Sequence, residues 1–234
     1  RRKLKIFFGA DPIINNIYWA TSLKNKTISA DSVVFYSKDS FIAKNSDYDK
    51  NIEFHTIKFP RVNNKKILNF YSIINSIFIY YSYDYFWISF NGASLSRSLL
   101  GRWEIIWMKI CNKKVLVFPF GGDSYVYSEI LDESFKHAFL TSHSEQLKNQ
   151  DKIKKNKSLF FKYLDFFPAT ITEDKFVPKW HFVRPSFLSI DIDKFKPLNI
   201  KKSKSEVVVV HAPNHRGFKG TEIIVNAVNE LIQE

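Results

Sequence analysis

Two cations and two glycines alternate in a short loop of this 234-residue chain. Arg216, Gly217, Lys219 and Gly220 follow an apolar run and precede a segment with helical periodicity. Glycines let a ligand approach the backbone, and the first turn of a helix adds partial positive charge to the full charges of the side chains. A diphosphate is the ligand that suits this loop. Its glycine spacing differs from those of the Walker loop and the dinucleotide-binding loop.

A second loop that could bind a ligand covers residues 9–16. Gly9 would let a ligand approach the backbone, and the helix start that carries Asn15 and Asn16 could face an anion or a hydroxyl group. The alternative is a plain turn in which Asp11 caps the helix.

A third loop, Gly121-Gly122-Asp123, directly follows an apolar run. Its two glycines indicate positive φ angles or the close approach of a ligand. The Asp123 carboxylate could accept hydrogen bonds from sugar hydroxyls or orient a base, so Asp123 is the candidate catalytic residue. The alternative is that Asp123 caps the segment that begins at Ser124.

Alternating strand and helix patterns predict the elements that would hold these loops. The expected strands cover residues 4–8, 32–36, 52–57, 84–90, 114–118, 169–172 and 181–183. The expected helices cover residues 13–23, 65–81, 99–110 and 159–164, with a polar lead-in at 142–156. This order predicts an α/β fold with a Rossmann-like parallel sheet. Ligands bind beyond the carboxyl ends of such strands, where the three loops, a turn at 91–94 and an extended segment at 183–197 lie.

The pattern changes after residue 196. Residues 197–205 are polar and basic and resemble a linker, whereas residues 206–210 predict a strand and residues 222–232 an amphipathic helix. One strand-loop-helix unit is too small to bury a core. We therefore interpret residues 1–196 as one domain and residues 206–234 as the incomplete start of a second.

The charge balance points to an anionic partner. The chain holds 35 Lys and Arg against 23 Asp and Glu, a net charge of +12, although a biased base composition of the gene would also explain it. Nucleic acid is not expected, because no recognised reader motif is present. A single cysteine, Cys111, excludes an internal disulfide and favours the cytoplasm. Apolar runs are far shorter than the roughly 20 residues that cross a bilayer, and no signal-peptide pattern is present.

Two other chemistries fit the sequence poorly. His211 and His215 are four residues apart but flank Pro213, so they cannot be neighbours on a helix, and no metal site is expected. A serine hydrolase is not expected either, because no Gly-x-Ser-x-Gly elbow occurs.

Four segments together resemble one enzyme family. "VHAPNHRGFKGTEIIVNAVNEL" is similar to the start of the C-terminal domain of GT-B glycosyltransferases of the retaining, family-four type, which carries an R-x-x-K-G loop. "RPSFLSIDIDKFKP" resembles the interdomain segment of that family. "FPFGGDSYVY" and "FFGADPIINNIYWATSLK" resemble a G-x-D loop and the first strand-loop-helix of its N-terminal domain.

The resemblance implies a sugar transfer from a UDP- or GDP-type nucleotide sugar to a glycan or a lipid-linked acceptor, without a cofactor, in bacterial surface polysaccharide biosynthesis. Arg216 and Lys219 would bind the donor β-phosphate, with Gly217 and Gly220 beside them. The acceptor side of the cleft would be lined by six residues: Gly9, Asn15, Asn16, Gly121, Gly122 and Asp123.

The chain departs from that family in two ways. The E-x7-E motif that holds the donor sugar would lie beyond Glu234, so we expect residues 1–234 alone to be inactive. The catalytic histidine that some members carry has no clear counterpart in His137 or His143.

Aromatic and basic residues suggest a peripheral position on the inner face of an anionic membrane. Tyr80, Tyr81 and Tyr83 are candidate anchors, whereas Phe78 and Trp87 are expected in the core. Two other functions remain open. One is a non-catalytic α/β module that binds a polyanion or a protein, and the other is a nucleotide-sugar epimerase.

Overall fold

The fold is described from a computed structural model of the chain. The structure describes residues 2–11, 13–36, 55–58, 64–119, 123–142, 144–169, 181–183, 190, 192–193, 195–197, 208–212, 216–217 and 219–233. Gly121, Gly122 and His143, together with most of the predicted linker and of the segment at 183–197, lie outside these residues.

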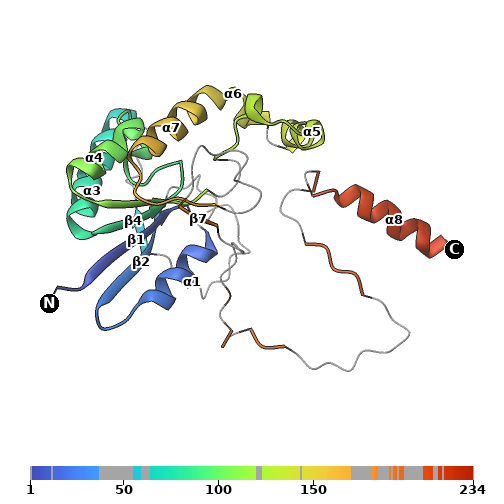
Figure 1. Cartoon of the computed structure of the whole chain (residues 1–234), viewed down its shortest axis with the longest axis horizontal. Coiled ribbons are helices and arrows are strands. Elements are labelled where there is room, and N and C mark those ends of the chain that lie inside the picture. Colours follow the sequence, from blue (N-terminus) through green and yellow to red (C-terminus); the bar gives the residue numbers. More distant parts are fainter. Residues whose placement is uncertain are drawn as a thin grey trace.

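A parallel sheet forms the centre of the fold (Figure 1), as the sequence predicts. Its described strands lie in the order β3-β2-β1-β4-β5, and all four pairings between neighbours are parallel. These strands are β1 (Leu4–Ala10), β2 (Ile28–Tyr36), β3 (His55–Lys58), β4 (Tyr85–Ile88) and β5 (Lys114–Val117). A smaller parallel pair joins β6 (Pro168–Ala169) to β7 (Phe182–Val183).

Helices cover both faces of the sheet (Figure 1). One face packs against α3 (Lys65–Ser82), α4 (Glu104–Ile110) and α7 (Gln150–Tyr163), which share one large core cluster with the strands. The other face packs against α1 (Ile14–Leu23) in a smaller cluster around Phe8. Adjacent Phe7 and Phe8 point to opposite faces and are both fully buried, because successive side chains of a strand alternate.

Trp87 packs beside the smaller cluster, as expected. Its ring lies 4.9 Å from that of Trp19 and 5.7 Å from that of Phe118.

The lysine-rich segment was wrongly predicted as a polar lead-in. Residues 150–163 form the continuous helix α7, which is preceded by α5 (Glu133–Ser142) and α6 (Ser144–Lys148). Phe160, Phe161 and Leu164 are buried in the main core, and Ile153 lies two turns before Phe160 on the same side. Apolar residues at helical spacing therefore hold the helix against the sheet, together with the buried Lys157, while Lys152, Lys154 and Lys155 are exposed.

Helix α3 is present as predicted, but several of its large apolar side chains do not face the core. Phe78 is 66% exposed, so its expected core position is wrong. The inward-facing side chains include Ser72, Ser76, Ile79 and Tyr80. Ser76 lies inside because its hydroxyl takes part in a buried hydrogen-bond network described below, whereas the buried Ser72 hydroxyl has no partner among the described residues.

The expected helix at 99–110 begins with a different geometry. A 3-10 turn, η2 (Gly101–Trp103), leads into α4, and a second 3-10 turn, η1 (Leu95–Arg97), precedes it. A third, η3 (Tyr127–Glu129), follows the Asp123 loop. The backbone of Gly101 passes the carbonyl oxygen of Leu95 so closely that an added Cβ would lie 2.7 Å from it.

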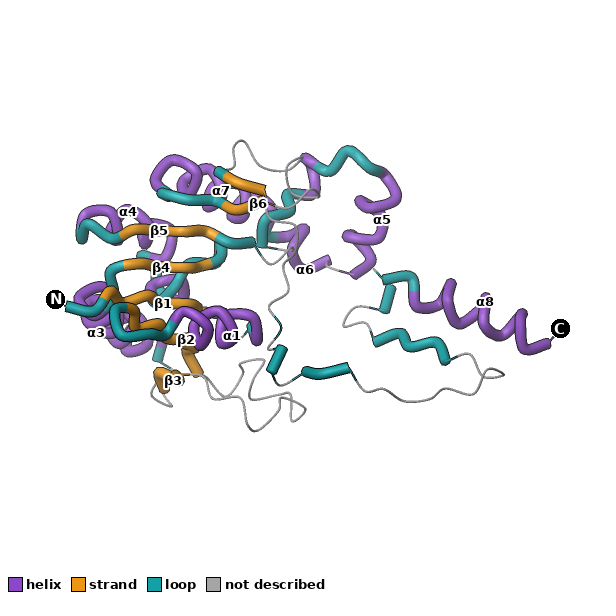
Figure 2. The backbone as a smooth tube through the Cα atoms, turned by 60° about the horizontal axis from the view of Figure 1, so that its bottom comes forward, coloured by secondary structure: helices purple, strands orange, loops and turns teal. Residues whose placement is uncertain are grey.

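The final helix, α8 (Thr221–Gln233), confirms the helix expected at 222–232. The strand expected at 206–210 is wrong for its described part, because residues 208–210 belong to no described strand and are exposed. A strand needs a neighbour for its backbone groups, and no described strand lies beside these residues. Figure 2 shows α8 and residues 208–210 away from the sheet. None of the described helices is both long and apolar enough to cross a membrane.

Candidate functional site

Three loops meet at the carboxyl ends of β1, β4 and β5. β1 and β4 are neighbours in space but not in sequence, and the chain leaves them toward opposite edges of the sheet. This is the switch point of the topology, where the loops separate and leave room for a ligand.

Hydrogen bonds join the three loops. The Ser89 hydroxyl, after β4, donates to Asp11 Oδ2, after β1, at 2.6 Å. The Phe90 amide donates to Asp123 Oδ2, after β5, at 3.2 Å. The Asn91 amide completes the turn by donating to Ser89 Oγ at 3.1 Å. Two carboxylates from distant segments are thus held on either side of one turn.

Asp11 does not act as the helix cap that the sequence allowed as an alternative. Helix α1 begins after Ile13 without a side-chain cap, and the Asp11 carboxylate accepts from Ser89 instead. The contact of Asp123 with Phe90 spans 33 positions of the chain.

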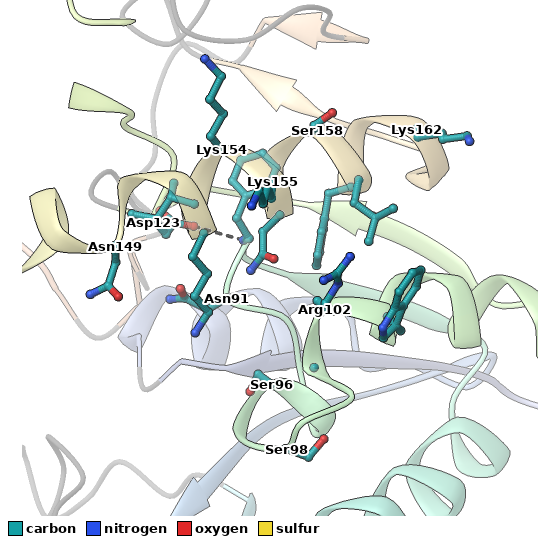
Figure 3. A pocket seen from close by; sticks show the side chains of 18 of the residues that line it. Asn91, Ser96, Ser98, Arg102, Asp123, Asn149, Lys154, Lys155, Ser158 and Lys162 are labelled. Carbon is teal, nitrogen blue, oxygen red and sulfur yellow. Dashed lines mark hydrogen bonds between the residues drawn. The ribbon is translucent and has the colours of Figure 1, made fainter. Parts of the chain in front are cut away.

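A cleft of about 1390 Å³ opens beside these carboxylates (Figure 3). Asp11, Asn91 and Asp123 line one end of it. One wall is the segment from Ser96 to Trp103, and the other wall is α7. A volume of this size admits a ligand of several sugar or nucleotide units.

The wall at residues 92–103 is held by a buried carboxylate, Glu104. Its oxygens accept from the amide of Ala93 at 2.8 Å, from the amide of Leu95 at 2.7 Å and from the hydroxyl of Tyr80 at 2.8 Å. Ser94 Oγ joins the network 2.7 Å from Ser76 Oγ on α3. Burial raises the pKa of Glu104, although these donors act in the opposite direction.

Gly92 is required beside this carboxylate. Its φ of +85° is a conformation that favours glycine, and an added Cβ would lie 2.5 Å from Glu104 Oε2.

The α7 wall is held by apolar packing and by ion pairs. Lys157 Nζ lies 2.7 Å from Glu129 Oε2, and Lys154 Nζ lies 3.3 Å from the other oxygen. Burial alone would raise the pKa of Glu129, but the hydrogen bonds and charges of these two lysines lower it. After the helix, Asp165 accepts from Lys109 Nζ at 2.7 Å and from the amide of Val115 at 2.8 Å.

The acceptor-side residues expected from the sequence are only partly assembled. Asp123 lines the cleft, whereas Gly9, Asn15 and Asn16 are not among its described lining. Gly9 is buried in β1, where an added Cβ would collide with the carbonyl oxygen of Val33. Asn16 is buried at the start of α1, and its Nδ2 donates to the carbonyl oxygen of Asp11 at 3.3 Å. Gly121 and Gly122 lie outside the described residues.

The cationic loop before α8 lies apart from this cleft. Arg216 forms an exposed ion pair of 2.9 Å with Glu222, and His211 Nε2 lies 2.9 Å from Thr221 Oγ1. None of Arg216, Gly217, Lys219 and Gly220 lines the described cleft. The two predicted halves of a site are therefore not brought together among the described residues.

Sequence reasoning missed the cationic lining of the cleft. Lys152, Lys155 and Lys162 come from α7, and Arg102 comes from η2. The sequence pattern that could have predicted this lining is the helical spacing of the apolar residues at 153, 160, 161 and 164. That spacing would have placed Lys152, Lys155 and Lys162 on the helix face away from these apolar residues. Nothing in the sequence around Arg102 placed it opposite α7.

Two candidate catalytic histidines remain without support. His137 is exposed on α5, and His143 lies outside the described residues. Within the described part of the chain, no group of three or more His, Cys, Asp or Glu side chains could hold a metal ion.

No family model, curated protein or solved structure matches this chain.

Proposed function

We propose that residues 1–196 form the acceptor-binding domain of a GT-B glycosyltransferase, and that residues 206–234 begin its donor-binding domain. The supporting observation is the pair of carboxylates, Asp11 and Asp123, held at the switch point of a parallel sheet and open to a large cleft. Carboxylates accept hydrogen bonds from sugar hydroxyls, and this edge of the sheet is where such folds bind ligands.

The reaction is the transfer of a sugar from a nucleotide diphosphate to a hydroxyl of a glycan or of a lipid-linked acceptor. Asp123 orients that hydroxyl and accepts its hydrogen bond. Arg216 and Lys219 neutralise the charge that develops on the departing nucleoside diphosphate. Because Arg216 pairs with Glu222 at an exposed position, the donor only has to displace a weak ion pair to reach it.

Turnover by the protein expressed from its complete gene tests this proposal. UDP- and GDP-sugars are supplied with and without oligosaccharide acceptors, and release of nucleoside diphosphate is measured. We expect acceptor-dependent release, which falls about 100-fold in Asp123→Asn and about 10- to 100-fold in Arg216→Ala, because each change removes a contact to a reacting group.

Lys66→Ala is the matched control, since Lys66 is exposed on α3 outside the cleft. Activity equal to wild type in both site variants would refute the assigned roles. Isomerisation of the donor without an acceptor would instead identify an epimerase. A non-catalytic module for a polyanion is the second candidate, favoured by the lysines of α7, and binding without turnover would support it.

A further inference from the structure

The cleft has two chemically different ends. Its lining holds five cationic side chains and two carboxylates. Figure 3 shows Asn91 and Asp123 toward one end, with Arg102 and Lys162 toward the other. A neutral sugar chain would use the carboxylate end but would leave the cationic end without a partner.

Helix α7 presents its cations as a stripe. Lys152 and Lys155 are three residues apart and both line the cleft, followed by Asn156 and Leu159 on the same face. The rise of about 1.5 Å per residue separates Lys152 and Lys155 by about 5 Å along the helix axis, which suits neighbouring anionic groups of one ligand.

The cations of this stripe are available to a ligand. Among the described residues, the side chains of Lys152 and Lys155 form no ion pair or hydrogen bond. Lys154 also lines the cleft but differs, because it pairs with Glu129.

The opposite wall supplies a second cation. The Arg102 guanidinium lies 4.6 Å from the centre of the Trp103 ring, so stacking rather than a carboxylate holds it. Figure 3 shows Lys155 and Arg102 in the space between α7 and η2. Both cations therefore face one channel that leads toward Asp123.

We propose that the cleft binds an anionic oligosaccharide, whose hydroxyl-bearing end meets Asp11 and Asp123 and whose phosphate or carboxylate groups meet Lys155, Lys152 and Arg102. This inference rests on the proposed function and specifies its acceptor class. A guanidinium binds either anion through two parallel hydrogen bonds, and an ammonium group binds either as a point charge.

Calorimetric titration of the 234-residue chain tests the inference. The probes are tetragalacturonate, maltotetraose 1-phosphate and neutral maltotetraose. We expect one or both anionic probes to bind at least about tenfold more tightly than maltotetraose, because charge-assisted contacts add to the contacts of the sugar. Comparison of the two anionic probes shows whether carboxylate or phosphate is preferred.

The double variant Arg102→Ala/Lys155→Ala should lose this preference, whereas Lys66→Ala/Lys113→Ala, with the same loss of charge, should keep it within about twofold. Circular dichroism checks that both variants fold. Equal binding of neutral and anionic probes would overturn the inference but leave the proposed function standing. Equal losses in both double variants would overturn the assigned site, and no binding of any probe would overturn both proposals.

Discussion

The two walls of the cleft are held in place by different physics. The α7 wall rests mainly on buried aromatic side chains such as Phe160 and Phe161, together with an ion pair of the buried Lys157 with Glu129. The wall at residues 92–103 rests on the buried carboxylate of Glu104, which accepts from two backbone amides and a tyrosine hydroxyl. Apolar packing tolerates small shifts, whereas a buried polar network needs all of its partners. The second wall should therefore be the more sensitive to single substitutions and to pH.

The largest effect is expected for Glu104→Ala. The change leaves the amides of Ala93 and Leu95 and the Tyr80 hydroxyl without their acceptor. Since each buried unsatisfied donor costs about 1–3 kcal/mol, the free energy of unfolding should fall by about 3–5 kcal/mol in urea denaturation.

Glu133→Ala is the control for this change, because Glu133 is exposed and pairs only with the neighbouring Lys136. It should cost no more than about 0.5 kcal/mol. A loss below about 1 kcal/mol for Glu104→Ala would mean that the Glu104 network does not hold its wall.

A smaller effect is expected from pH. A rise in pH should change the stability contributions of the two walls in opposite directions. The raised pKa of Glu104 means that its contribution to stability is fully present below the unfolded-state pKa and is lost as pH rises through the folded-state pKa. Between these values the loss is about 1.4 kcal/mol per pH unit. Beside α7, burial tends to raise the pKa of Asp165, but hydrogen bonds from Lys109, Val115 and Lys114 lower it. Its contribution is present above its unfolded-state pKa and is lost as pH falls through its folded-state pKa.

Urea denaturation between pH 3 and pH 8, roughly the range in which carboxylates titrate, measures both contributions. The stability difference between wild type and Glu104→Gln should shrink or reverse as pH rises. The difference between wild type and Asp165→Asn should shrink as pH falls. The same sign for both variants would contradict the contrast between the walls.

The smallest effect is expected on the outer face of α3. Phe78 is 66% exposed, whereas Ile79, its neighbour in sequence, is 4% exposed in the core. Thermal or urea unfolding should show that Phe78→Ser changes stability by about 0.5 kcal/mol or less, whereas Ile79→Ser costs about 2–5 kcal/mol. Similar losses for both variants would place Phe78 in a packed environment after all.

The sequence predicted the fold better than the site. Strong periodic segments were recognised, so β1, β5, α1, α3 and α8 lie close to their expected bounds. The three loops that follow β1, β4 and β5 were also recognised as places for a ligand. Their order in space was not predictable, because the pairing of β1 with β4 joins segments about 80 residues apart.

The misses have a common cause. The outer position of Phe78, the cleft-facing lysines of α7 and the missing strand at 208–210 all depend on what lies next to each segment. Local patterns report which conformation a segment prefers, but not which neighbour it meets.

By itself the sequence determined the alternation of strands and helices, because period and turn chemistry are local properties of the chain. It also placed the candidate functional residues, Asp123 among them, in loops after strands. Only the tertiary structure decided that Asp11 and Asp123 flank one turn, that Arg102 faces Lys155, and that serines of α3 turn inward. Those choices depend on contacts between distant segments, and the buried carboxylate of Glu104 shows why. Its donors come from residues 80, 93 and 95, and no local pattern predicts that they meet.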